Sequence, residues 1–435
     1  MQCPRCQQDN QSHAKFCLAC GIPVSDPTSQ ARTYTELKRE IEGLQRSLGE
    51  ALERQTATAT SEILSVIANS LPDLQPVMDA GLPAASRMSA SARAVAGAEC
   101  SVDRSEELRV ERAEDPVSGE WNQFVERAPD AELYHDFRWR ALVQRIFGHE
   151  APYLMARDGA GAVAGVLPLV RLRSRLFGDF VVSLPYFNYG GVLASTPSAA
   201  RTLVAAAERY ARDCNADHVE LRHRTPLDVG LPVRESKVTM LLDLPGSEGE
   251  LWSGLKAKLR SQIRRPEKEG ATVREGSAGL LDDFYSVFAR NMRDLGTPVY
   301  SKRFFAAILS FFAERSRVIV VYLDGRPMAA GLMLAHRSTL EIPWASSIRE
   351  GNRVGLNMLL YWSALRYAVR SGFRRFDFGR STKDSGTYRF KEQWGASPQP
   401  LHWYYVLAAR QVLPDLRPSN PKYRLAVRHL VKNLP

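Results

Sequence analysis

From Trp121 onward, short apolar stretches alternate with amphipathic ones. Residues 151–174, APYLMARDGAGAVAGVLPLVRLRS, contain two apolar runs around a polar turn at Asp158–Gly161, which is the pattern of a β-hairpin. Residues 317–346, RVIVVYLDGRPMAAGLMLAHRSTLEIPWAS, repeat this pattern with LDGRP as the turn. Strands that alternate with amphipathic helices are typical of a mixed α/β sheet. The pattern predicts the α/β (α+β) class for the body of the chain.

Each hairpin is followed by a helical pattern and a further apolar strand, at 199–223 in the first half and at 357–379 in the second. The order strand, turn, strand, helix, strand therefore occurs twice. An internal duplication of one α/β unit is the economical explanation. We expect two similar folds, over residues 119–245 and 246–435, with the C-terminal tail returning to the first.

Residues 30–100 are predicted to be helical. Apolar positions recur there at alternating steps of four and three, at Leu37, Ile41, Leu44, Leu48 and Ala51. Because this seam is short and interrupted by glycines, it fits either a coiled coil that forms a homodimer or a plain connector helix. The stretch EALERQTATATSEILSVIANSLPDLQPVMDA resembles the helix before a GAF sensor domain, but no sheet pattern follows it. Residues 101–118 are polar and charged, as in a linker.

Four of the six cysteines form two CxxC pairs separated by ten residues, namely Cys3, Cys6, Cys17 and Cys20. Four thiolates at this spacing suit a tetrahedral Zn²⁺ whose coordination positions are all filled by protein. Two disulfides are the alternative, which the two-residue gaps and a cytosolic location disfavour. The spacing predicts a structural zinc ribbon over residues 1–26. It resembles small bacterial zinc ribbons at the head of multidomain regulatory proteins.

The formal net charge is +10, because Lys and Arg outnumber Asp and Glu. Such an excess favours anionic partners such as phosphate-bearing donors, RNA or an acidic lipid surface, although solubility alone would also explain it. The sequence begins without a basic segment followed by an apolar core, and no apolar run reaches the ~18 residues of a membrane span. We therefore expect a cytoplasmic protein, with peripheral membrane association left open.

From about residue 115 the chain resembles the FemAB-related branch of the GCN5-like acyltransferases, in particular the members associated with exosortase and PEP-CTERM systems. The stretches that carry the resemblance include LWSGLKAKLRSQIRRPEKEG, NMRDLGTPVYSKRFF and FDFGRSTKDSGTYRFKEQWGASPQPLHWYYVL. The resemblance implies two tandem GCN5-like folds. It also implies transfer of an acyl or aminoacyl group to an amine in cell-envelope or exopolysaccharide biosynthesis.

The acyl donor stays open among aminoacyl-tRNA, acyl-CoA and acyl carrier protein. Acetyl-CoA enzymes of this superfamily usually carry Arg or Gln, two residues, then Gly-x-Gly or Gly-x-Ala before a helix whose backbone amides hold the pyrophosphate. In REGNRVGLNMLL, Gly351 and Gly355 precede an apolar helix, but the pattern is not met. This departure weakens a CoA donor and agrees with the FemAB branch, whose relatives use aminoacyl-tRNA.

The strongest catalytic candidates lie in residues 376–395. Asp377 stands between two phenylalanines of a predicted strand, where it could pair with Arg380 or accept a proton. Tyr388 and Lys391 are three residues apart on one predicted helix face and could donate to a carbonyl oxygen or a phosphate. We expect Tyr388 and Lys391 to act as electrostatic donors, Arg380 as an anion contact and Asp377 as their organiser.

Eight further residues are candidates for substrate binding. The aromatic loop SLPYFNYGG could line an acceptor pocket or simply pack, and the basic face of KAKLRSQIRR could meet phosphates or solvent. Two more follow the candidate Asp in the chain. The set is Tyr186, Asn188, Tyr189, Lys256, Arg260, Arg264, Ser381 and Trp394.

A non-catalytic function is the alternative hypothesis. In that case the tandem fold would hold an anionic envelope precursor as a scaffold, and the zinc ribbon would recruit it to its partners.

Overall fold

The computed structural model describes residues 2–3, 5–11, 17–20, 108–174, 178–295 and 299–407. The chain divides into two compact units, Met1–Ala59 and Thr60–Pro435, and the second contains all helices and strands named below. The predicted heptad seam, the GAF-like leader and most of the linker lie outside the described residues. In the part of the chain that is described, no helix has the length and apolar character needed to cross a membrane.

The first half of the body contains two sheets. An antiparallel sheet has the order β1–β2–β3–β6, formed by Arg109–Arg112, Leu154–Arg157, Val163–Leu167 and Leu193–Ala194. A second sheet has the order β4–β5–β7–β16–β8, formed by Val170–Ser174, Gly178–Val182, Val219–His223, His402–Val406 and Val233–Arg234. The helices are η1 (Asp115–Val117), α2 (Ser118–Arg127), η2 (Leu133–His135), α3 (Arg138–Phe147) and α4 (Pro197–Asp213).

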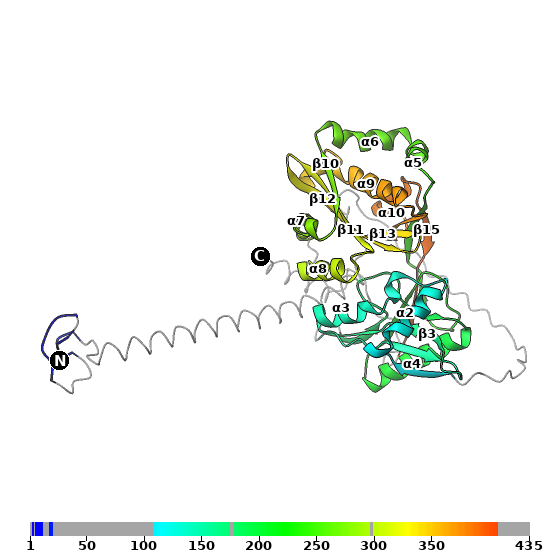
Figure 1. Cartoon of the computed structure of the whole chain (residues 1–435), viewed down its shortest axis with the longest axis horizontal. Coiled ribbons are helices and arrows are strands. Elements are labelled where there is room, and N and C mark those ends of the chain that lie inside the picture. Colours follow the sequence, from blue (N-terminus) through cyan, green and yellow to red (C-terminus); the bar gives the residue numbers. More distant parts are fainter. Residues whose placement is uncertain are drawn as a thin grey trace, which may run out of the picture. The chain divides into compact units, whose positions relative to one another are not determined.

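The second half contains one seven-stranded sheet of order β10–β11–β12–β13–β14–β9–β15. These strands are Thr272–Gly276, Ser316–Leu323, Arg326–His336, Thr339–Ser347, Arg375–Thr382, Lys237–Asp243 and Ser397–Pro400. The helices are α5 (Glu248–Gly254), α6 (Ala257–Lys268), η3 (Ala278–Leu280), α7 (Leu281–Asp294), α8 (Lys302–Phe311), η4 (Arg349–Gly351), α9 (Leu356–Arg370) and α10 (Gly386–Glu392). Figure 1 shows these helices on both sides of the sheet.

Helix α4 illustrates how the sequence sets an element. The Thr196 hydroxyl accepts a hydrogen bond from the Ala199 amide (3.1 Å), and Pro197 occupies the first turn, where its missing N–H costs nothing. Leu203 and Ala207 are fully buried at a spacing of four, so one face of the helix packs against the first-half sheets. Capping and apolar spacing together fix this helix.

Alternation along β11 shows why the second sheet is buried on both faces. Val318 and Val320 contribute to a core shared with α7, α8 and the first half, whereas Ile319 and Val321 contribute to a core with α5, α6, α9 and α10. Successive side chains of a strand point to opposite faces, so these neighbours belong to different cores. We call these the inter-half core and the outer core. The inter-half core joins both halves into one folded body.

Both halves contain a parallel strand–helix–strand unit, β5–α4–β7 in the first half and β13–α9–β14 in the second. The two halves also exchange strands. Strand β9 precedes every other element of the second half in the chain but pairs with β14 in the second-half sheet. Strand β16 follows β15 of the second half in the chain but pairs with β7 in a first-half sheet. The predicted α/β class and the tandem arrangement are confirmed.

Candidate active site

The two central strands of the second half separate at a fork. Strands β13 and β14 are paired in parallel only from Thr339–Arg375 to Glu341–Asp377, after which β13 continues along β12 and β14 along β9. Glu341 and Asp377 are thus the last residues that face each other before the strands part. Neighbouring parallel strands that diverge leave backbone groups and side chains facing a common gap, which is a frequent position for ligands in α/β sheets.

A β-bulge just beyond the fork orients the predicted residues. The pairing of β14 with β9 shifts register between Asp377 and Arg380, and Gly379 adopts φ +75° there. Because of the extra residue, Asp377 and Arg380 both face the inter-half core. Asp377 bonds to Tyr189, and the Arg380 Cζ lies 5.0 Å from the ring centroid of Trp403. The flanking phenylalanines face the outer core, as the alternation predicts.

Asp377 is held by three donors and is 2% exposed. Its Oδ2 accepts from the Tyr189 hydroxyl at 2.7 Å, and its Oδ1 accepts from the Thr239 hydroxyl and the Gly379 amide, both at 2.7 Å. A carboxylate fixed in this way is rigid and organises the bulge, the neighbouring strand and a loop of the first half. The predicted role of Asp377 as an organiser of the catalytic residues remains a prediction.

Glu341, which the sequence analysis did not select, lies beside Asp377 and is 8% exposed. Its Oε2 accepts from the Tyr134 hydroxyl at 2.5 Å. Its Oε1 is buried and has no hydrogen-bond partner among the described residues. Burial and the nearby charge of Asp377 raise the pKa of Glu341 well above its usual range. The signal in the sequence was a single carboxylate inside the apolar run TLEIPWAS.

A third carboxylate, Glu132, lies near Glu341 and Asp377 and is less buried than they are. Glu132 forms an ion pair with Arg224 (2.5 Å), and the two side chains are 16% and 21% exposed. Burial raises the pKa of Glu132 to about 7, in spite of the opposing charge of Arg224. The Arg224 Nε is buried without a partner in the described part of the chain. We call Glu132, Glu341 and Asp377 the acidic cluster.

Both halves supply the acidic cluster and the residues that bond to it. Glu132, Tyr134, Tyr189 and Arg224 come from the first half, while Thr239, Glu341 and Asp377 come from strands of the second-half sheet. The sequence analysis selected only Asp377 and Tyr189 from this set. The others became visible once the halves were packed together.

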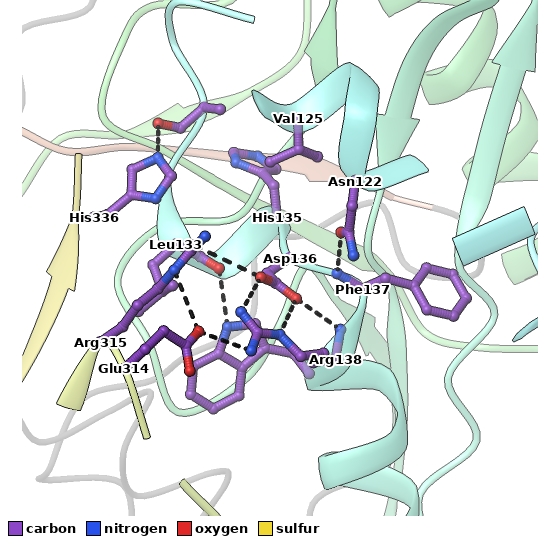
Figure 2. A network of polar contacts seen from close by, with 12 residues as sticks. Asn122, Val125, Leu133, His135, Asp136, Phe137, Arg138, Glu314, Arg315 and His336 are labelled. Atoms are coloured by element: carbon purple, nitrogen blue, oxygen red, sulfur yellow. Dashed lines mark hydrogen bonds and ion pairs between the residues drawn. The ribbon is translucent and has the colours of Figure 1, made fainter. Parts of the chain in front are cut away.

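A polar network holds η2, which carries Tyr134, against the second half (Figure 2). Asp136 accepts from the Nε (3.0 Å) and Nη2 (2.8 Å) of Arg138. The Arg138 Nη1 reaches across to Glu314 (2.9 Å), and Arg315 lies 3.7 Å from Asp136. Bidentate pairing of this kind fixes orientation as well as charge. The network therefore fixes the position of η2 relative to β11.

The predicted donors on α10 are directed inward. The Lys391 Nζ donates to the backbone carbonyls of Gly379 (3.1 Å) and Arg380 (2.8 Å), so it fastens the bulge. Tyr388 is 9% exposed and packs in the outer core. Trp394 is 2% exposed in the same core, and its indole nitrogen has no described partner. Ser381 is fully buried next to Arg380.

The aromatic loop at 183–191 is only partly directed at the fork. Tyr189 reaches Asp377, whereas the Tyr186 hydroxyl lies 2.9 Å from the Nε2 of His149. Tyr186 adopts φ +78°, an uncommon conformation for a bulky residue that indicates local strain. Asn188 is half-buried at the tip of the loop. Of the three predicted residues, the structure brings Tyr189 to the acidic cluster.

The basic face of α6 forms a separate surface. Lys256 is the N-terminal cap of the helix, Arg260 donates to the Ser253 carbonyl (3.3 Å), and Arg264 stacks over Trp252 with 5.0 Å between Cζ and the ring centroid. A surface pocket of about 570 Å³ lies along this helix and is lined by Ala257, Arg260, Ser261, Gln262, Arg264, Arg265, Lys268 and Glu269. These residues do not include any member of the acidic cluster.

The parallel strands of the first half, β5 and β7, end at a buried ion pair. At its end Val182 faces Glu220, which bonds to Arg222 (2.8 Å) and accepts from the Tyr405 hydroxyl (2.8 Å). Burial alone would raise the pKa of Glu220, but the charge of Arg222 and these bonds leave it lowered. The end of the first-half parallel pair therefore holds a carboxylate neutralised by Arg222, whereas the fork of β13 and β14 holds Glu341, one oxygen of which has no partner among the described residues.

The four cysteines of the N-terminal unit come together as a set. Their sulfur atoms all lie within 4.8 Å of one another, with Cys3–Cys20 and Cys6–Cys17 at 3.5 Å. Backbone N–H groups lower the pKa of the Cys17 thiol to about 6, which favours the thiolate that binds metal. Four sulfurs at these separations fit tetrahedral coordination of one metal ion.

A family model described as acetyltransferase (GNAT) domain matches residues 253–392. No curated protein matches the sequence. The solved structure of FemX is 16% identical, with 68% of this chain and 97% of that chain covered at a TM-score of 0.54. A tandem GNAT protein from the clavulanic acid biosynthesis pathway is 14% identical, covering 70% and 100% at a TM-score of 0.48. L-PGS from Bacillus licheniformis is 12% identical, covering 74% and 98% at 0.45.

The GNAT match includes β13, β14 and α10, and therefore the whole fork and the two cluster residues that it contributes. At these identities the likeness to FemX concerns the fold, which the two chains share over most of their length. Residues 253–392 therefore contain an acetyltransferase (GNAT) domain, which makes the protein an acyltransferase, and the body is built from two tandem α/β folds.

Proposed function

We propose that the protein is a FemAB-like N-acyltransferase or aminoacyltransferase that transfers an acyl group to an amine. The observation that supports this most directly is the fork of β13 and β14, where buried carboxylates from the GNAT-matching region meet tyrosines from the other half. Transfer to an amine requires the loss of a proton from nitrogen, and a carboxylate near the reacting atoms can accept that proton. No covalent nucleophile is needed.

The remaining predicted residues take supporting roles in this proposal. Asp377 organises the site, Arg380 provides an anion contact, and Lys391 holds the bulge through two carbonyls. Tyr388 and Trp394 build the wall behind the bulge. The cationic face of α6 would meet the phosphates of the donor, in keeping with aminoacyl-tRNA, acyl-CoA or acyl carrier protein.

The cellular setting is a further part of the proposal. The FemAB resemblance supports a cytoplasmic enzyme of cell-envelope or exopolysaccharide assembly, associated with PEP-CTERM systems, whose acceptor is an amine-bearing precursor. The cysteine cluster would hold a structural Zn²⁺, and its filled coordination leaves it outside the chemistry.

The test is transfer of a labelled acyl group by the purified full chain. Aminoacyl-tRNA, acyl-CoA and acyl carrier protein are supplied in parallel, each with amino-sugar and peptide acceptors. We expect one donor class to give an amide product, and Asp377→Asn to reduce its formation. Absence of product with all three donors, together with saturable binding of an anionic precursor, would instead support the scaffold hypothesis.

A further inference from the structure

We propose that the basic face of α6 is a binding site for linked phosphate groups, such as a diphosphate or a triphosphate. The inference rests on one part of the proposed function, the contact of α6 with the phosphates of a ligand, and states its chemistry. All residues that line the site belong to α6 and its C-terminal cap. None comes from the turn at Gly351 and Gly355, where an acetyl-CoA enzyme would hold its pyrophosphate.

Four cations surround a hollow on the solvent side of the helix. The surface pocket of about 570 Å³ has the size of a small-ligand site. Its lining includes Arg260, Arg264, Arg265 and Lys268, together with a single carboxylate, Glu269. All of these except the half-buried Arg260 are exposed, so a ligand reaches them directly from solvent.

The protein leaves these four cations without carboxylate partners. None of them forms an ion pair with another described residue. Helix α9, which packs beside α6, differs in this respect, because Arg366 pairs with Glu248 (2.8 Å) and Arg370 with Glu275 (2.7 Å). Three of the four cations on α6 also recur every four residues, a spacing at which like charges destabilise a helix. A bound anion would neutralise them.

Two of the arginines are held in place before any ligand binds. Arg260 donates to the Ser253 carbonyl (3.3 Å), and Arg264 stacks over Trp252 with 5.0 Å between Cζ and the ring centroid. Neither contact neutralises the guanidinium, and each restrains a long side chain that would otherwise lose entropy on binding. Guanidinium groups offer paired donors that match phosphate oxygens. The Ser261 hydroxyl, also in the lining, adds a neutral donor.

Composition and shape favour linked phosphates over larger anionic partners. Among the described residues, the large hydrophobic side chains that are exposed are Leu18 and Val233, and neither lies on α6. Protein docking surfaces need such anchors, and single-stranded RNA needs aromatic platforms for its bases. Cations around a hollow suit a compact group better than the plane of a bilayer. Arg260 and Lys268 are eight residues apart, about 12 Å along the helix, which suits several phosphates in a row.

The site lies on the opposite face of the seven-stranded sheet from the acidic cluster. Leu259 and Ile263, on the inner side of α6, belong to the outer core, whereas Tyr134 and Tyr189, which bond to the cluster, belong to the inter-half core. Figure 1 shows α6 on the side of the second half that faces away from the first half. The sheet therefore separates phosphates on α6 from the acidic cluster. The site holds the carrier part of a ligand and not its reacting atoms.

The experiment is calorimetric titration of the purified full chain with inorganic pyrophosphate and with tripolyphosphate, at about 0.15 M salt. Arg265→Gln and Lys268→Gln should each weaken binding about 10-fold or more, because each removes a charged contact to phosphate. Lys258→Gln is the matched control. It removes the same charge from an exposed position of α6 that does not line the pocket, so the affinity should change by less than about 3-fold.

A pair of carboxylate variants tests the sign of the effect. Glu269→Gln should tighten binding, because it removes a negative charge from the lining. Glu267→Gln removes an equal charge from an exposed position of α6 outside the lining and should change the affinity less. Since all five variants are at exposed positions, we expect each to fold, and thermal unfolding checks this.

Three results would overturn the inference. The first is no saturable binding of either phosphate chain. The second is equal weakening by Lys258→Gln and Arg265→Gln, which would indicate a general attraction of anions to the helix. The third is binding confined to duplex RNA or to phosphatidylglycerol vesicles, titrated in parallel, which would assign the face to that macromolecule. Pyrophosphate binding without transfer from any donor supports the inference and counts only against the proposed function, whereas transfer without pyrophosphate binding does the reverse.

Discussion

Acidification should destabilise the body through a histidine that is buried in its neutral form. The His223 Nε2 accepts a hydrogen bond from the Val192 amide (3.2 Å), and the His135 Nε2 lies 3.1 Å from the Gly191 carbonyl. These two groups belong to one peptide bond, so two imidazoles hold the same peptide unit from either side. Protonation of His223 would remove the acceptor. Burial, which disfavours the charged imidazolium, lowers the pKa of His223 to about 3.

The magnitude follows from linkage between protonation and folding. The unfolded chain binds a proton near the ordinary pKa of about 6.5, whereas native His223 binds one only near 3. Stability is therefore complete above pH 6.5 and is lost as the pH falls. From pH 7 to pH 5 this one group costs about 2 kcal/mol. Because pH 5 lies well above the native pKa, the figure depends mainly on the unfolded value.

The assay is urea unfolding of wild type and His223→Gln at pH 7, 6 and 5. A glutamine amide oxygen can accept the Val192 hydrogen bond, but it does not titrate. We expect the free energy of unfolding of the variant to fall by about 2 kcal/mol less than that of wild type between pH 7 and pH 5. Equal losses in the two proteins would refute the reasoning, since His223 would then titrate alike in the native and unfolded states.

Four further outcomes can be measured. The full chain should contain one zinc ion by elemental analysis, and Cys17→Ser, which removes one of four sulfur ligands, should lose it. Gly379→Ala should cost about 1–2 kcal/mol in urea unfolding, because φ is +75° although the space is free. Gly191→Ala should cost more, since its Cβ would lie 2.2 Å from an imidazole nitrogen. Asp136→Ala should cost about 1–3 kcal/mol, because Arg138 loses its bidentate partner.

Several features of the protein could be predicted because they depend on local chemistry. Paired CxxC turns, hairpins with polar turns and amphipathic helices each need only a few neighbouring residues. Asp377 could also be found, because a carboxylate between two phenylalanines of a strand is conspicuous. Its contacts could not be found, because Tyr189 and Thr239 come from other elements.

Lys391 shows the limit of arguments from helix faces. Its spacing from Tyr388 places both on one side of α10, but spacing does not say what that side faces. The tertiary structure directs the ammonium to the carbonyls of the β14 bulge. The predicted roles of these two residues as donors to substrate remain predictions.

The sequence alone determined the fold class, the duplication and the cysteine set, because hydrophobic period and ligand spacing are properties of a short segment. Only the tertiary structure decided which carboxylates share the site. Tyr134 meets Glu341 across 207 positions of the chain, and the fork at which Glu341 lies depends on strand register. A register is set by the sum of packing across a whole sheet, so no single segment encodes it.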